Sequence, residues 1–96
     1  MPQQKRRPRA APHRSRIDIL SEMLQAANGV NVKKTKLMYK SLLGYAQLTE
    51  LLSDLTENGL LDYNEKTQTF RTTDKGVRFL KIYNEIKNIL GKVVVE

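Results

Sequence analysis

The chain has 96 residues, of which 40% are hydrophobic, and this is enough apolar material for one small domain but not for two. It has no cysteine and one histidine, so disulfide frameworks and zinc sites built from cysteines or histidine pairs are excluded. No stretch of 18 consecutive apolar residues occurs, and we expect no membrane-spanning helix. The formal net charge is +7, from 17 basic and 10 acidic side chains, which favours a polyanionic partner.

The positive charge is concentrated at the N-terminus. Residues 1–16 hold six basic side chains and no acidic one, whereas the other 80 residues hold 11 basic and 10 acidic side chains. Residues 1–14 contain all three prolines and no Leu, Ile, Val or Phe, so we predict a disordered basic arm. Because no apolar residues alternate with the arginines, the arm favours nucleic acid over a membrane surface, with a solubilising tail as the alternative. Its candidate phosphate-binding residues are Lys5, Arg6, Arg7, Arg9, Arg14 and Arg16.

The first predicted helix follows the arm. Apolar residues recur at three-to-four spacing over residues 17–27, which is typical of an amphipathic helix. Ser15 is its expected N-cap, Asp18 is the capping-box partner three residues later, and Gly29 follows its end. Residues 30–32 are expected to form a short extended piece at most.

Two further helices are predicted, over about residues 33–42 and 45–58, joined by a turn at Leu43 and Gly44. The apolar side chains of the third helix share one face and comprise Leu48, Leu51, Leu52 and Leu55. Two helices joined by a tight glycine-containing turn are typical of a helix-turn-helix unit.

A β-hairpin and a final helix complete the predicted pattern. Two short alternating segments, residues 60–63 and 68–72, flank a polar connection and indicate a hairpin. Thr73 is the expected N-cap of a helix over residues 74–90, which Gly91 is expected to end. The order helix, helix, helix, hairpin, helix predicts a mainly α fold with a small β wing, a winged helix-turn-helix.

Several segments of this predicted domain, residues 15–92, resemble a known family. They are Thr35–Ser41 with Leu43, Tyr45, Gln47 and Leu48, then Asn58–Leu61, and then Phe70–Gly76. Over about residues 15–90 the chain resembles an archaeal winged-helix family, typified by the ten-kilodalton Sulfolobus chromatin proteins and related transcriptional regulators. The resemblance implies DNA binding and, as in some members, dimerisation through an antiparallel coiled coil of the last helices.

In this architecture the third helix enters the major groove. Its outward candidate residues are Tyr45, Gln47, Thr49 and Ser53. Gln47 is suited to pair with adenine, Ser53 with a phosphate or a base edge, and Tyr45 with the backbone. The same face has no lysine or arginine and carries Glu50 and Asp54, so we expect sequence-independent contacts elsewhere to supply most of the attraction. An ordinary solvated or packed helix surface is the alternative.

Basic residues elsewhere in the fold are placed to meet phosphates. The second helix crosses the DNA backbone in this architecture, and its region carries Lys33, Lys34, Lys36 and Lys40. The predicted wing carries Lys66, Gln68 and Arg71. Both sets are candidates for DNA contact, and both are also compatible with an ordinary solvated surface.

The last helix has more apolar surface than one small domain can cover. Phe79, Ile82, Ile86, Ile89 and Val93 follow spacings of three and four, which is typical of a coiled-coil seam. A neighbouring face is suited to pack against the domain and comprises Val77, Leu80, Tyr83 and Leu90. We therefore predict a homodimer through this helix, and the alternative is a wide core stripe.

No catalytic constellation is visible in the sequence. There is no phosphate-cradling glycine-rich loop and no cysteine nucleophile, and His13 lies in the arm. We predict a non-enzymatic, cytoplasmic and nucleoid-associated protein without cofactor, metal or small-molecule substrate. The first hypothesis is a winged-helix protein that binds duplex DNA, either a transcriptional regulator or a nucleoid-associated factor. The alternatives are a protein-interaction winged helix associated with the transcription machinery and RNA binding through the arm.

Overall fold

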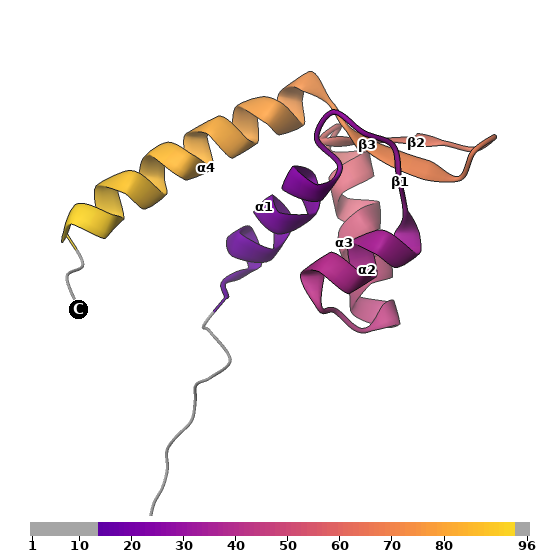
Figure 1. Ribbon diagram of the computed structural model, residues 1–96, viewed down its shortest axis with the longest axis horizontal. Helices are drawn as coiled ribbons and strands as arrows, with labels where there is room; N and C mark the ends of the chain where they lie inside the picture. The colour runs from indigo at the N-terminus through magenta and orange to yellow at the C-terminus, as the bar shows by residue number, and fades with distance from the viewer. Residues whose placement is uncertain (1–13, 94–96) are drawn as a thin grey trace, which may run out of the picture.

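The computed structural model describes residues 14–93, in which four helices accompany a three-stranded antiparallel sheet. In chain order the elements are α1 (Arg16–Ala26), β1 (Val32–Lys33), α2 (Lys34–Ser41), α3 (Tyr45–Glu57), β2 (Leu61–Asn64), β3 (Thr69–Thr72) and α4 (Asp74–Val93). Figure 1 shows α1, α2 and α3 grouped together, with the β2–β3 hairpin projecting as a wing and α4 extending in the opposite direction. This arrangement confirms the predicted winged helix-turn-helix fold. No helix among the described residues is long and apolar enough to cross a bilayer.

Local hydrogen bonds explain where the first and last helices begin. At the start of α1 the Ser15 hydroxyl accepts a bond from the Asp18 amide at 3.2 Å, and the Asp18 carboxylate accepts one from the Ser15 amide at 3.0 Å. This reciprocal pair confirms the predicted capping box. At the start of α4 the Thr73 hydroxyl accepts a bond from the Gly76 amide at 3.1 Å, as expected of an N-cap.

The strand β1 was not predicted as part of the sheet. The sequence predicts a short extended piece at most over residues 30–32, but Val32 pairs with Phe70 and Lys33 pairs with Thr69 of β3. The sheet order is therefore β1-β3-β2. Two residues are too short a run to show alternation, and only the hairpin supplies the strand against which they pair. Because Lys33 belongs to this strand, α2 begins one residue later than expected.

The end of α4 differs from the prediction, and the end of α2 has a strained backbone. Gly91 does not end α4, which continues to Val93, because a glycine inside a helix costs only about 1 kcal/mol and need not break the hydrogen-bond ladder. The helix α2 ends at Ser41, and its C-cap residue Leu42 has a φ of 58°, which lies in the left-handed region that favours glycine. Its side chain is 80% exposed, so packing does not explain the choice of leucine there.

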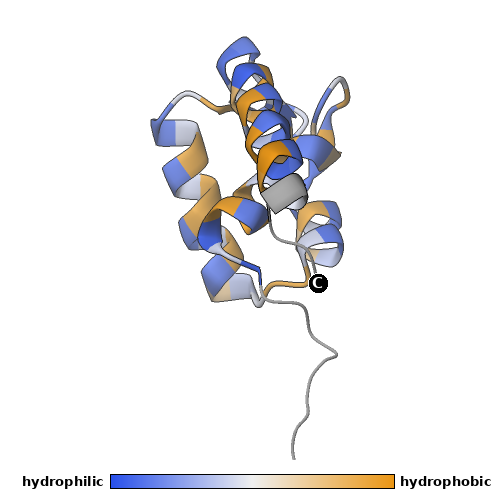
Figure 2. Cartoon of the chain, turned by 90° about the vertical axis from the view of Figure 1, so that its left-hand side faces the viewer, coloured by the Kyte–Doolittle hydropathy of each residue, from blue (hydrophilic) through white to orange (hydrophobic). Residues whose placement is uncertain are grey.

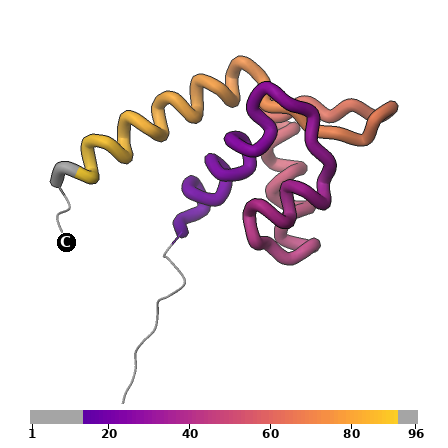
Figure 3. The backbone as a smooth tube through the Cα atoms, viewed as in Figure 1, coloured from indigo at the N-terminus to yellow at the C-terminus, as the bar shows by residue number. Residues whose placement is uncertain are grey.

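The core lies where α1, α2 and α3 meet the sheet, as the path of the backbone in Figure 3 shows. The four predicted leucines of α3 are all buried. They pack in one cluster with Met23 and Leu24 of α1, Leu37 of α2 and Leu80 of α4. The sheet is fastened to α1 by Thr72, whose hydroxyl donates to the Leu24 carbonyl at 2.7 Å. Burial of each such leucine contributes roughly 1.5–3 kcal/mol, so this cluster dominates the stability of the domain.

The helix α4 packs on the domain through part of its surface only. Leu80 is buried, and Phe79 is half-buried against the core. The Tyr83 hydroxyl donates to the Asp18 carboxylate of α1, which raises the pKa of Tyr83 and lowers the pKa of Asp18. Val77 and Leu90 were expected on the packed face but are both exposed, so the contact between α4 and the domain is narrower than predicted.

Candidate nucleic-acid interface

The outward face of α3 carries the polar residues expected there. Tyr45, Gln47, Thr49 and Ser53 are all exposed. The Thr49 hydroxyl donates to the Tyr45 carbonyl at 2.9 Å, and the Ser53 hydroxyl donates to the Glu57 carboxylate at 3.2 Å. Both hydroxyl oxygens keep lone pairs that can accept further hydrogen bonds. This face can therefore bind donors on base edges without breaking the hydrogen bonds that Thr49 and Ser53 make within α3.

Lys34 links the start of α2 to the start of α3. Its ammonium nitrogen donates to the Tyr45 hydroxyl at 3.1 Å and lies 4.3 Å from the centroid of the Tyr45 ring. The hydrogen bond and the charge of Lys34 lower the pKa of the Tyr45 hydroxyl. This contact holds a positive charge beside the exposed face of α3, which itself carries none.

The lysines near α2 do not form one patch. Lys33 and Lys34 lie beside the wing and α3, and the Lys33 ammonium donates to the Thr67 carbonyl at 3.4 Å. Lys36 and Lys40 instead line a shallow depression formed with residues of α1, including Glu22. Lys36 and Lys40 follow Lys34 by two and six residues. Because a helix has 3.6 residues per turn, their side chains lie on a different side of α2 from that of Lys34. The sequence predicts a basic segment here, but it does not predict that these lysines lie on two different sides of the domain.

The residues of the wing are divided in the same way. Gln68 has a φ of 57°, in the left-handed region, and its side chain lies on the side of the wing that faces α3. Arg71 stands opposite Asp62 in the sheet register and lines a separate depression with Lys66. Alternation along β3 explains this division, because Phe70 points into the core and its neighbour must point out.

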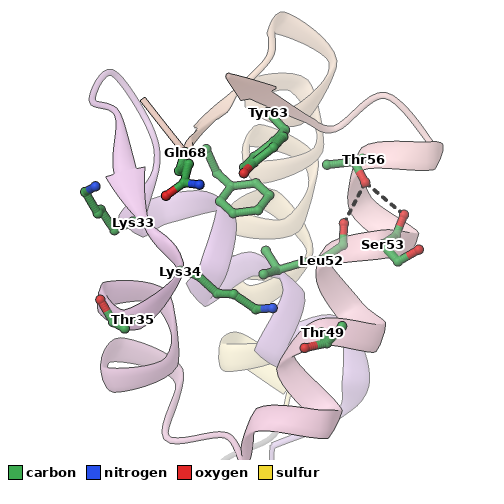
Figure 4. Close-up of a pocket in the computed structure, with 10 residues that line it drawn as sticks. Lys33, Lys34, Thr35, Thr49, Leu52, Ser53, Thr56, Tyr63 and Gln68 are labelled. Carbon is green, nitrogen blue, oxygen red and sulfur yellow. Dashed lines mark hydrogen bonds between the residues drawn. The ribbon is translucent and has the colours of Figure 1, made fainter. Parts of the chain in front are cut away.

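A hollow of about 530 Å³ lies between α3, the wing and the junction of β1 with α2 (Figure 4). Ten residues line it: Lys33, Lys34, Thr35, Thr49, Leu52, Ser53, Thr56, Tyr63, Gln68 and Phe70. Five of the sequence candidates, Lys33, Lys34, Thr49, Ser53 and Gln68, therefore meet at one place. The sequence interpretation missed Tyr63 and Thr56. The alternation of β2 carried a signal for Tyr63, because it places this ring on the same side of the strand as buried Leu61.

Ion pairs offset part of the negative charge of the domain. Arg16, the first residue of α1, pairs with the Asp54 carboxylate of α3, and Arg14 pairs with Glu22 of α1. Both arginines were assigned to the arm, yet both contact the folded domain. The remaining arm candidates, Lys5, Arg6, Arg7 and Arg9, lie outside the described residues, and so does the side chain of the seam candidate Val93.

Comparison with known proteins agrees with the geometry. A family model described as winged helix-turn-helix matches residues 13–91, which is most of the chain. A search of curated proteins finds no match. Domains of this fold typically bind nucleic acid through the third helix and the wing, and they are not typically catalytic. The matched range begins before α1 and includes α1, α2, α3, the sheet and nearly all of α4. The chain belongs to the winged helix-turn-helix family.

Proposed function

We propose that this protein binds duplex DNA with α3 in the major groove and acts as a transcriptional regulator or a nucleoid-associated factor. The observation that carries the proposal is the convergence of Lys33, Lys34, the hydroxyls of α3 and the wing on one side of the domain. In a winged helix the third helix reads the groove while neighbouring basic groups hold the phosphates. The described residues therefore supply both kinds of contact from the same side.

The binding is expected to be weakly sequence-specific. Thr49 and Ser53 can accept or donate single hydrogen bonds, whereas strong base discrimination rests on bidentate side chains. Gln47 is the one residue of α3 suited to a bidentate contact with adenine. The exposed carboxylates of Glu50 and Glu57 on the same helix oppose close approach to phosphates. Backbone contacts from the lysines and the arm would then supply most of the affinity.

Titration of a mixed-sequence duplex at several salt concentrations tests the proposal. Each phosphate contact contributes about 0.9 to the slope of log affinity against log salt. Lys34→Gln should therefore reduce the slope by about 0.9, whereas Lys81→Gln, which removes an exposed lysine of α4, should leave it unchanged. Absence of salt-dependent binding by the full chain at low salt would refute the proposal. A genome-wide occupancy profile then separates a regulator, which gives discrete peaks, from a nucleoid-associated factor, which gives broad coverage.

The arm is proposed to add phosphate contacts. Because Arg14 and Arg16 are paired with carboxylates of the domain, four basic residues of the arm remain for DNA: Lys5, Arg6, Arg7 and Arg9. Deletion of residues 1–12 should reduce the salt slope by roughly 3 to 4. An unchanged slope would show that the arm is only a solubilising tail. The same titration with duplex RNA tests the alternative that the arm prefers RNA.

We also propose that α4 pairs with α4 of a second copy. Ile82, Ile86 and Ile89 are 56%, 50% and 63% exposed, and they share one side of the helix. Ile82 and Ile86 also line a largely apolar groove between α1 and α4, together with Ile17 and Phe79. Figure 2, which looks toward the free end of α4, shows apolar patches along this helix. An apolar surface of this extent is typical of an interface, and a helix repeat of three and four suits a paired helix.

Sedimentation at several protein concentrations tests the pairing. Ile86→Glu places a charge in the exposed isoleucine row and should shift the protein to a monomer. Asn88→Glu adds the same charge on the opposite side of α4 and should leave the dimer intact. A wild-type protein that sediments as a monomer at high concentration would refute the pairing without affecting the proposal that each copy binds DNA.

A second candidate function is the docking of a basic protein partner on α3. The exposed carboxylates of Glu50 and Glu57 favour it, because they would attract a basic surface and repel phosphate. Glu50→Gln distinguishes the two functions, since removal of this charge should strengthen DNA binding and weaken binding to a basic protein. Weaker DNA binding by Glu50→Gln would instead indicate that the carboxylate contacts a base, as it can with cytosine.

A further inference from the structure

The hollow beside α3 has the volume of a small-molecule site and is open to solvent. Its volume of about 530 Å³ falls within the range of roughly 300–1,000 Å³ that is typical of such sites. Three separate parts of the chain form its walls: the junction of β1 with α2, one side of α3, and the wing. The side chains of α3 along this wall, Thr49, Ser53 and Thr56, are short, and their hydroxyls donate to other groups of α3, so they do not cross the hollow (Figure 4).

One part of the lining is apolar. Leu52 and Phe70, both largely buried, form the floor beneath the mouth of the hollow. The ring of Tyr63 stands beside that of Phe70, with 4.7 Å between the ring centroids and an angle of 42° between the planes. Tyr63 is partly exposed, so one surface of this aromatic pair is available to a further ring.

The polar part of the lining is suited to an anion. Lys33 and Lys34 stand on one rim, and the described residues that line the hollow include no carboxylate. The ammonium of Lys34 has three donors and gives one to the Tyr45 hydroxyl, so it can bind a carboxylate without breaking that contact. Gln68 adds an amide donor from the wing, and Figure 4 shows Lys34 reaching from α2 toward Thr49 and Leu52.

Duplex DNA cannot fill this space. DNA presents phosphates and base edges as a continuous surface, so the phosphates would meet the lysines on the rim and leave the apolar floor uncovered. We propose that the hollow binds a small amphipathic anion, an aromatic ring system bearing a carboxylate, and that this ligand competes with DNA for Lys34. The competition rests on the proposed function, whereas the ligand site does not.

The magnitude of the competition follows from linkage. A ligand that binds only the DNA-free protein reduces the apparent affinity for DNA by a factor of one plus the ratio of ligand concentration to its Kd. At a tenfold excess over Kd the affinity should therefore fall about elevenfold.

A nuclear magnetic resonance titration of the full ¹⁵N-labelled chain with 2-naphthoate tests the site in the absence of DNA. The expected result is saturable shifts of the amides of Thr49, Ser53, Tyr63 and Phe70. The neutral analogue 2-naphthalenemethanol should bind more weakly. Lys34→Gln should weaken naphthoate binding roughly tenfold through loss of a charge-assisted hydrogen bond, whereas Lys81→Gln should not.

The outcomes separate the ligand site from the proposed function. Saturable binding at the hollow together with loss of DNA affinity supports the whole inference. If naphthoate binds saturably at the hollow but the protein binds no DNA, the ligand site stands. The competition and the proposed function are then both refuted. Shifts confined to the groove near Ile82 and Ile86, or no saturable shifts at millimolar naphthoate, overturn the inference and leave DNA binding untouched. Equal binding of Lys34→Gln and wild type also overturns it.

Discussion

Gly76→Ala should destabilise the protein although alanine is the better helix former. A Cβ atom added at Gly76, in the first turn of α4, would lie 2.5 Å from the Leu60 carbonyl oxygen and 2.5 Å from the Thr72 Cγ2 atom. Ordinary van der Waals contacts begin near 3.4 Å, so one of these groups must move by about an ångström. Only glycine leaves room for the close approach of α4 to the loop before β2.

Neither neighbour of Gly76 can move freely. The Leu60 carbonyl accepts a bond from the Thr73 amide at 3.1 Å, and the Leu60 amide donates to the Leu55 carbonyl at 2.8 Å. Thr72 is held by its hydroxyl bond to Leu24. Overpacking of this kind costs roughly 1–3 kcal/mol, and loss of the Thr72 hydrogen bond adds about 1 kcal/mol. The gain in helix propensity returns about 1 kcal/mol, so the free energy of unfolding should fall by about 2 kcal/mol.

Thermal and urea unfolding of the purified protein measure the effect, with an expected loss of roughly 10 °C in Tm for a domain of this size. Gly91→Ala in the same helix is the matched control, because nothing lies within 4 Å of an added Cβ there. It should raise the free energy of unfolding by up to about 1 kcal/mol. A Gly76→Ala protein as stable as the wild type would refute the described packing of α4 against Leu60 and Thr72.

Four other substitutions have expected outcomes that unfolding experiments can check. Leu42→Gly and Gln68→Gly each relieve a left-handed backbone and should raise the free energy of unfolding by roughly 0.5–1 kcal/mol, whereas Glu65→Gly, without a positive φ, should lower it. Asp18→Ala removes the capping box and the Tyr83 contact and should cost about 1–2 kcal/mol at pH 7. Because the pKa of Asp18 is lowered in the folded state, this stabilisation is present above its unfolded pKa of about 3.9 and is lost as pH falls through the folded pKa. A difference between wild type and Asp18→Ala that grows on acidification would contradict this account.

The sequence predicted those features that depend on near neighbours. The Ser15 capping box is a contact between residues three apart, and the leucine stripe of α3 follows from the helical period alone. Helix ends depend on more than the local sequence, which predicts a stop at Gly91. The helix α4 continues through it because one unfavourable residue does not outweigh the surrounding hydrogen bonds.

Features that depend on distant residues could not be predicted in the same way. The strand at Val32 exists only because β3 lies beside it, 38 positions later in the chain. The pairing of Arg16 with Asp54 likewise joins residues that the sequence assigned to separate functions. The candidate site was found in part, because residue type marked Lys34, Thr49 and Gln68, but their meeting at one hollow depends on how three elements pack.

The pairing of Val32 with Phe70 also has a consequence for the order of folding. The junction that carries Lys33 and Lys34 can be fixed only after the hairpin has formed, since β3 is the only strand within residues 14–93 that β1 joins. Contacts between residues so far apart form late, and a ladder of two residues at the edge of a sheet opens easily. Amide hydrogens of β1 should therefore exchange with solvent far sooner than those of Leu51 or Leu55. A partner that binds this junction would contact a part of the domain that opens easily, and its binding should slow that exchange.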